Sequence, residues 1–321
     1  MKHIFSKKIV WFLIPVVCVA LAVAAFFMYG SIANQSINSD FYVSGGTIMS
    51  VAAGKEAVDN YDASVSKIEN VLYRNGVDYT NAEYELSTQD YKDQAKIIVR
   101  YSDVKGADMT QLNVTISEQL AAEFAEFATV ENIVSYDTVN KSLMESTILN
   151  ALLAVGIALL IIPVYMLFRY GWANALSGLL SSLIALVVFI SLIVLTHIQI
   201  NNAIIGIFAY VILATAVGNI VVFDKVKYLR KKLDFKGTKA EAQNVVGTAV
   251  CKALKGIFGF AVVLLLSALI FAIVGTKGIS MAALAVICGT VAAFYSVILF
   301  APNLSVILIT APDKKKAKAK K

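Results

Sequence analysis

The feature that most constrains this chain is a long apolar run that ends abruptly at a cluster of cations. Residues 203–223 contain no Asp, Glu, Lys, Arg or His, and Lys225, Lys227 and Arg230 follow shortly afterwards. A helix of this length can cross a hydrocarbon layer about 30 Å thick. Because Lys and Arg accumulate in the cytoplasmic loops of membrane proteins, we expect this helix to run inward and to end in the cytoplasm.

Five further apolar runs have the length of a membrane-spanning helix. They cover residues 9–29, 146–168, 172–195, 256–274 and 279–309. With a hydrophobic content of 58 %, the chain is too apolar for a soluble globule, and the runs predict an α-helical polytopic membrane protein with six transmembrane helices. Lysines before the first run and after the last one predict that both termini are cytoplasmic.

The first apolar run has two interpretations. Small residues at positions 31–33 imitate the cleavage site of a secretory signal. However, the run is longer than the usual signal core of about 7–15 residues. We therefore expect an uncleaved membrane helix.

Acidic and basic residues are separated along the chain. Residues 31–145 hold eighteen acidic and eight basic residues, whereas the rest of the chain holds four acidic and twenty basic ones. This asymmetry predicts an acidic domain on one side of the membrane and basic loops on the other. Basic loops beside membrane spans set topology or contact anionic lipid, so we expect anionic lipid, and no nucleic acid, as a partner.

The acidic segment has the pattern of a folded α+β domain. Stretches rich in β-branched and aromatic residues alternate with two stretches of helical spacing. The expected elements are a strand at 41–52, a helix at 58–73, strands at 77–86 and 95–102, a helix at 109–127 and a strand at 129–139. The order βαββαβ predicts a ferredoxin-like sheet with both helices on one face.

These patterns predict four segments. The expected order is a membrane helix in residues 1–30, an extracytoplasmic α+β domain in 31–140, a five-helix bundle in 141–311 with a basic cytoplasmic loop at 224–255, and a basic cytoplasmic tail in 312–321. Within the loop, we expect residues 234–250 to form an amphipathic helix along the membrane interface.

Three short motifs resemble those of one known family. Residues 221–227 (VVFDKVK) resemble the "VVFDRIR" junction of the SecF family, residues 44–47 (SGGT) its "FTGGT" segment, and residues 167–172 (LFRYGW) its "LRFEW" turn. The arrangement of one span, an outer domain and five more spans is also similar to that family. The resemblance singles out Gly45 and Gly46, Arg169 and Trp172, and Asp224 with Lys225.

The resemblance implies a function. Members of the SecF family pair with SecD in the bacterial cell membrane, associate with the SecYEG channel, and use the proton-motive force to draw unfolded polypeptides outward. A non-enzymatic auxiliary subunit of protein export, without a cofactor, is therefore expected.

The chain departs from the family where protons are expected to pass. The family's Asn-Asp pair falls on Val217 and Gly218, which leaves Asn219 as the nearest polar neighbour, and the family's Arg at the start of the fifth helix falls on Lys252. The five predicted bundle spans contain no Asp, Glu, Lys, Arg or His. Since an Asn side chain does not titrate near neutral pH, our hypothesis is that this subunit does not itself conduct protons. Either its SecD partner supplies the ionisable groups, or coupling is weakened or lost.

Each singled-out residue also has a plain structural interpretation. Asn219 could be a polar contact between helices or part of a transport path. Asp224 could pair with Lys225 or Lys227 at the interface, or carry protons. The Gly45-Gly46 pair could be a bulge or a hinge, and Gly171-Trp172 reads as a tight turn with an interfacial aromatic residue. We assign the small residues Gly256, Gly259, Ala282 and Gly289 to helix packing.

Other functional classes have less support. The three cysteines lie in or beside apolar runs, and neither a metal-ligand cluster nor a nucleophile or phosphate-binding motif is apparent, so an enzyme is not expected. Two alternatives stay open. One is half of a resistance-nodulation-division exporter for lipids or small molecules, and the other is a membrane-anchored sensor or scaffold.

Overall fold

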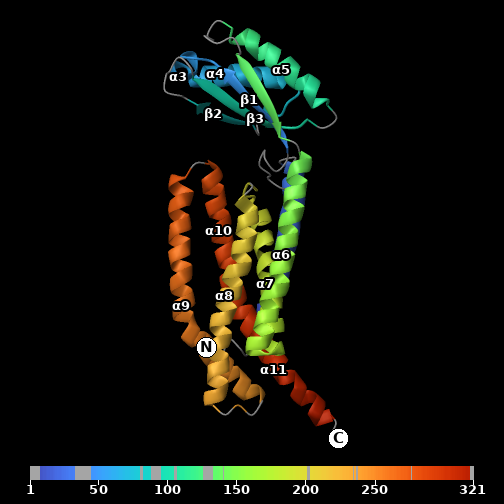
Figure 1. The fold of residues 1–321 in the computed structure, drawn as a ribbon, viewed down its shortest axis with the longest axis vertical. Coiled ribbons are helices and arrows are strands. Elements are labelled where there is room, and N and C mark those ends of the chain that lie inside the picture. Colours follow the sequence, from blue (N-terminus) through green and yellow to red (C-terminus); the bar gives the residue numbers. More distant parts are fainter. Residues whose placement is uncertain are drawn as a thin grey trace. The chain divides into compact units, whose positions relative to one another are not determined.

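A computed structural model describes most of the chain in two compact units (Figure 1). The described residues are 8–32, 45–79, 82–87, 95–104, 107–125, 133–139, 141–200, 203–233, 235, 238–275 and 277–318. One unit consists of Met1–Asn38 together with Ile148–Lys321, and the other of Ser39–Thr147.

The unit Ser39–Thr147 is built on an antiparallel sheet of four strands in the order β2-β3-β1-β4. Its elements are β1 (Gly46–Ala52), α3 (Glu56–Asp59), α4 (Tyr61–Arg74), β2 (Glu83–Ser87), β3 (Lys96–Ser102), α5 (Met109–Glu123) and β4 (Val134–Val139). A helical connection lies between β1 and β2 and another between β3 and β4. The predicted α+β, ferredoxin-like domain is confirmed.

Alternating burial along the strands explains this layering. In β3, Ile97, Val99 and Tyr101 are buried while the residues between them are more exposed, as expected for a sheet with one covered face. These side chains share a core with Leu72 of α4 and Leu120 of α5. The two helices therefore bury one face of the sheet.

A buried polar triad ties α5 to the sheet. Asn113 Oδ1 accepts a hydrogen bond from the Tyr101 hydroxyl at 2.7 Å, and Asn113 Nδ2 donates to Thr47 Oγ1 at 2.7 Å. All three side chains are buried. Burial raises the pKa of the Tyr101 hydroxyl, which keeps it neutral and able to donate.

Replacing Asn113 with alanine is expected to destabilise this unit. The change leaves the buried Tyr101 and Thr47 hydroxyls without their partner, at a cost of about 1–3 kcal/mol. Amide hydrogen exchange of β1 and β3 in the full chain measures the loss. Gln119→Ala on the same helix removes only an exposed hydrogen bond to Asn75 and serves as the control. Equal effects of the two changes would contradict the prediction.

Several predicted boundaries in this unit were wrong. Residues 77–86 were expected to form one strand, but β2 begins only at Glu83. Gly76 has φ +73°, and the Val77 amide donates to the Leu72 carbonyl at 3.0 Å, so this stretch completes the turn that ends α4. The predicted helix at 58–73 is interrupted at Asn60, which separates α3 from α4.

Parts of other predicted elements lie outside the described residues. These are positions 41–44 and 129–132 of the first and last predicted strands, and 126–127 at the end of the second predicted helix.

The other unit is a bundle of long helices, of which α6 begins within Ser39–Thr147. They are α1 (Lys8–Ile32), α6 (Lys141–Tyr170), α7 (Trp172–Thr196), α8 (Ala203–Lys232), α9 (Lys239–Val274), α10 (Lys277–Tyr295), the π-helix η3 (Ser296–Phe300) and α11 (Ala301–Lys318). Within the described residues, six helical segments are long and apolar enough to cross a membrane, with α10, η3 and α11 contributing to one of them. The six predicted spans are confirmed.

Aromatic contacts attach α1 to the rest of the bundle. Phe12 packs edge-on against Phe300, with ring centroids 5.1 Å apart. Tyr29 stacks on His197 and donates to the Leu195 carbonyl at 3.3 Å. The first span is therefore packed at both of its ends.

The basic loop predicted at 224–255 is mostly helical. Helix α8 continues to Lys232, and α9 starts at Lys239, where the Thr238 hydroxyl accepts from the Glu241 amide at 3.3 Å. Val245 and Val246 pack into a core that includes Val226 of α8. Residues 234–250 were expected to form a helix along the membrane interface, but α9 begins at Lys239 and its apolar face up to Val250 is covered by protein.

The last span contains a π-helical turn at Ser296–Phe300. Pro302 stands two residues after Phe300 and lacks the N–H that would bond to the carbonyl of Ile298. A wider turn re-registers the helix around such a break. Ser296 and Val297 lie in this turn, and both are buried in the interior of the bundle.

Candidate functional site

Three buried polar side chains from α7, α8 and η3 meet in the bundle core. Ser181 and Ser296 are joined through their Oγ atoms at 2.8 Å, and the Ser296 hydroxyl is also 2.6 Å from the Ser181 carbonyl. Asn219 Nδ2 donates to Ser181 Oγ at 3.1 Å. Asn219 Oδ1 has no hydrogen-bond partner in the described part of the chain. Asn219 therefore makes the predicted polar contact between helices, and its other predicted role, in a transport path, stays a prediction.

A second polar contact lies between α7 and α11. Asn174 Nδ2 donates to the Tyr170 carbonyl at 3.1 Å, and Asn174 Oδ1 accepts from the Ser305 hydroxyl at 2.7 Å. The Ser177 hydroxyl donates to the Ala301 carbonyl at 2.6 Å. Polar contacts thus hold α7 against α11 as well as against the π-turn.

Gly218 marks the closest approach of α8 to the π-turn. A Cβ atom at this position would lie 2.8 Å from Val297 Cγ2 and 2.9 Å from Val297 Cγ1. Because a β-branched Val has few alternative rotamers, even a methyl group requires the helices to shift. The carboxylate that the family resemblance expects here does not fit this packing.

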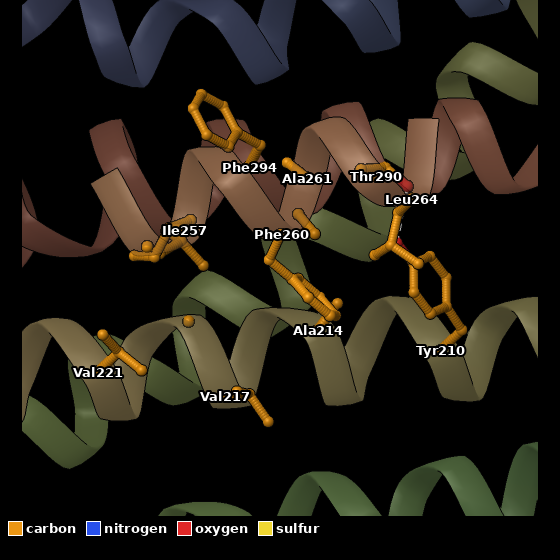
Figure 2. Close-up of a pocket in the computed structure, with 14 residues that line it drawn as sticks. Tyr210, Ala214, Val217, Val221, Ile257, Phe260, Ala261, Leu264, Thr290 and Phe294 are labelled. Atoms are coloured by element: carbon orange, nitrogen blue, oxygen red, sulfur yellow. Dashed lines mark hydrogen bonds between the residues drawn. The ribbon is translucent and has the colours of Figure 1, made fainter. Parts of the chain in front are cut away.

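A cavity of about 310 Å³ opens beside Val217 and Gly218, between α8, α9 and α10 (Figure 2). Figure 2 shows Phe260 and Leu264 of α9 facing α8, with Phe260 near Ala214 and Leu264 near Tyr210. The lining of this cavity is almost entirely apolar. The polar exception is the Tyr210–Thr290 pair, whose hydroxyls are 2.7 Å apart, and the Thr290 hydroxyl also bonds to the Val286 carbonyl at 2.8 Å.

The chemistry available in this cavity is limited. None of its lining residues is Asp, Glu, Lys, Arg or His. A side chain that gains and loses charge near neutral pH is therefore absent from its lining. Among the described residues there is also no group of three or more His, Cys, Asp or Glu side chains that could hold a metal ion.

Polar contacts join the end of α6, next to the α6–α7 turn, to α8. Arg169 Nη2 lies 3.3 Å from Asp224 Oδ1, and Lys227 Nζ donates to the Arg169 carbonyl at 2.7 Å. Asp224 was predicted to pair with Lys225 or Lys227, so the predicted partners were wrong. Lys225 is one position away on the helix and does not face Asp224. Lys227, three positions away, donates instead to the Arg169 carbonyl. Lys225 is exposed.

The remaining candidates of this turn behave as predicted. Gly171 has φ +85° and precedes α7, a conformation that L-residues with side chains rarely adopt. Trp172 begins α7 with its side chain half exposed. The predicted tight turn is confirmed, whereas the interfacial position of Trp172 stays a prediction.

Other predicted positions do not join the bundle core. Gly45, with φ +79°, precedes β1, and Gly46 opens β1 opposite Ser102 and Val139 in an unbroken register, so no bulge is present there. Lys252 is exposed on α9.

The glycines assigned to helix packing divide into two groups. A Cβ at Gly289 would lie 2.7 Å from Val211 Cγ2, which confirms close packing of α10 on α8. At Gly256 and Gly259 nothing lies within 4 Å of an added Cβ, so the prediction of close packing was wrong. Gly256 instead lines the cavity.

Sequence reasoning missed Ser181, Ser296, Tyr210 and Thr290. Polar residues within long apolar runs are a usable signal, because their hydroxyls need partners in hydrocarbon. Their partners come from different helices and cannot be paired by spacing along the chain.

Comparison with known proteins places this architecture in a family. Residues 119–311, more than half of the chain, match the family model described as "Protein export membrane protein SecD/SecF, C-terminal". The chain belongs to the SecD/SecF family. It is 23 % identical over 229 residues to the SecF protein translocase subunit of Helicobacter pylori strain 26695, a match that covers 71 % of this chain and 68 % of that protein. The SecF subunit of strain J99 is 23 % identical over 223 residues, covering 70 % and 66 %.

Solved SecDF structures share the fold over nearly the whole chain. The crystal structure of SecDF, a translocon-associated membrane protein from Thermus thermophilus, has a TM-score of 0.64 at 18 % identity and covers 97 % of this chain. SecDF in its super-membrane-facing form has a TM-score of 0.62 at 17 % identity, with the same coverage. This chain spans 38–39 % of the length of those SecDF chains.

Proposed function

We propose that this SecD/SecF-family chain is a non-enzymatic auxiliary subunit of the Sec export machinery. It acts with a SecD-like partner and the SecYEG channel to assist the passage of unfolded polypeptides across the bacterial cell membrane. The match to the SecD/SecF family over residues 119–311 carries this proposal. The shared fold with SecDF over 97 % of the chain supports it.

Partner identity tests this role. Affinity purification of the tagged full chain from its own cells is expected to recover a SecD-like chain together with channel subunits. Depletion of the chain is expected to slow the export of secreted proteins. Recovery of a second exporter half instead, with no secretion defect, would contradict the proposal.

The same proposal includes an orientation. Both termini lie in the cytoplasm, and the acidic α+β domain, predicted at residues 31–140, lies on the outer side. The distribution of Lys and Arg supports this assignment, since twenty of the 28 lie outside residues 31–145.

Single cysteines test the orientation. Cys18, Cys251 and Cys288 are replaced first, and Ala63→Cys on α4 or Ala317→Cys near the C-terminus is then introduced. Ala63 is exposed. A membrane-impermeant maleimide is expected to label the Ala63→Cys variant in intact cells, and the Ala317→Cys variant only after permeabilisation. The reverse labelling pattern would show that the α+β domain is cytoplasmic and the C-terminus is outside, which contradicts the proposed orientation.

A further part of the proposal is that the subunit does not itself carry protons. The apolar cavity beside Val217 and the tight packing at Gly218 support it, because both occupy the place where the family's ionisable pair is expected. In this account a SecD-like partner supplies the ionisable groups, which are costly within a membrane and are retained there for function.

Asp224→Asn is expected to change neither folding stability nor export appreciably. Asp224 and its partner Arg169 are 49 % and 50 % exposed, and water screens such a pair so well that its loss has little effect. Measuring proton-driven export with the variant checks this. If Asp224→Asn greatly reduced export while Asp224→Glu kept export near the level of the parent chain, a titrating role would instead be assigned to this carboxylate.

A further inference from the structure

A basic pocket lies at the ends of α6 and α8, next to the α6–α7 turn. Its cations are Arg169, Lys227, Arg230 and Lys231, and its aromatic walls are Tyr170 and Phe235. The pocket has a volume of about 340 Å³, which is enough for a phosphate-sized headgroup with its linked atoms. It is separate from the apolar cavity beside Val217.

The charges of this basic pocket are incompletely balanced. Among the described residues, Asp224 is the carboxylate paired with one of these cations, through Arg169. Lys227 donates to a backbone carbonyl, which leaves its charge uncompensated. No described acidic side chain lies within ion-pair distance of Arg230 or Lys231. The pocket therefore has a positive excess that favours an anion.

Aromatic rings hold several of these cations in place. The Arg230 guanidinium lies over the Phe235 ring, 4.6 Å from its centroid. Arg169 and Lys227 lie 5.6 Å and 6.0 Å from the centroid of Tyr170. Cations ordered on aromatic faces lose less conformational entropy when an anion binds. The Arg230 guanidinium can bind phosphate oxygens with two parallel hydrogen bonds. Arg169 already bonds the Tyr170 hydroxyl and Asp224, so it contributes mainly its charge.

The surface beside the basic pocket is apolar. Ile161, Tyr165 and Arg169 follow one another at four-residue steps, so they share a stripe of α6. Ile161 is 62 % and Tyr165 49 % exposed. Trp172, a residue type enriched at membrane–water boundaries, follows the turn. An anion in the pocket would thus sit at the end of an exposed apolar stripe of a membrane span.

We propose that the basic pocket binds the phosphate headgroup of an anionic phospholipid, whose acyl chains cover the exposed stripe of α6. The cations complement the charge of the phosphate. The apolar stripe favours a lipid, because acyl chains would cover it and a soluble phosphate compound would not. This gives the anionic lipid predicted from the basic loops a defined binding site.

Lipid retention by the purified, delipidated full chain tests the site. Phosphatidylglycerol, phosphatidylcholine or glycerol 3-phosphate is added, and bound molecules are counted by native mass spectrometry. The chain is expected to retain phosphatidylglycerol in preference to phosphatidylcholine. The double variant Lys227→Gln/Lys231→Gln is expected to lose roughly tenfold or more in phosphatidylglycerol affinity. Both lysines are exposed, so folding is expected to be unaffected.

Matched variants separate a defined site from general surface charge. Lys239→Gln/Lys255→Gln removes the same charge from exposed positions of α9 outside the pocket and is expected to bind like the parent chain. Lys227→Arg/Lys231→Arg keeps the charge and is expected to retain binding. Equal losses in both Gln variants, or equal retention of phosphatidylcholine, would overturn the proposal. Displacement of phosphatidylglycerol by an equimolar amount of glycerol 3-phosphate would also overturn it, in favour of a soluble phosphate ligand.

Discussion

Replacing Phe223 with alanine is expected to lower the free energy of unfolding of the bundle by about 2–4 kcal/mol. Phe223 is fully buried in the core shared by α8, α9 and α11, and its ring is 6.4 Å from that of Tyr170. The expected loss is below that of an equivalent change in a soluble core, because lipid is as apolar as the protein interior and mainly packing is lost.

Titration of the purified chain in detergent with sodium dodecyl sulfate measures this loss. Phe258→Ala on α9 is the matched control, because Phe258 is 56 % exposed and leaves no buried cavity when truncated. We expect a change of less than about 1 kcal/mol for the control. Equal losses at the two positions would show that the core around Phe223 is not packed as described.

Gly218→Ala and Gly206→Ala are expected to act in opposite directions, although both lie on α8. At Gly218 the new methyl group meets Val297, with an expected cost of about 1–3 kcal/mol. At Gly206 nothing lies within 4 Å, so alanine is expected to stabilise the helix by about 0.5–1 kcal/mol.

A double-mutant cycle tests the cause of the Gly218 effect. Val297→Ala alone leaves a small cavity, but combined with Gly218→Ala it makes room for the new methyl group. The two changes together are therefore expected to cost less than the sum of the single changes, by about 0.5 kcal/mol or more. Strict additivity would mean that contact with Val297 does not determine the preference for glycine.

The sequence predicted the membrane spans and the α+β domain because each depends on a local regularity. Charges are excluded from hydrocarbon, so residues 203–223 can be recognised as a membrane span from their own sequence, without knowledge of the segments that pack against them. The β-branched and aromatic residues of 96–102 and the helical spacing of 109–123 can likewise be recognised within a single segment.

What could not be predicted depends on contacts between distant segments. The pairing of Asp224 with Arg169 joins two helices, and nothing in the spacing near Asp224 indicates it. Residues 239–250 have a face that suits lipid or protein equally, and only the packed core shows that α8 covers it. The significance of Gly218 required the position of Val297, which the π-turn sets.

The central claim is that this chain assists export while its partner carries the protons. The most direct test is proton-driven uptake of an unfolded precursor by proteoliposomes that contain the channel, the SecD-like partner and this chain. Changing the intramembrane carboxylates of the partner to amides is expected to abolish the proton-driven component. Proton-driven uptake that persists after those changes would contradict the account.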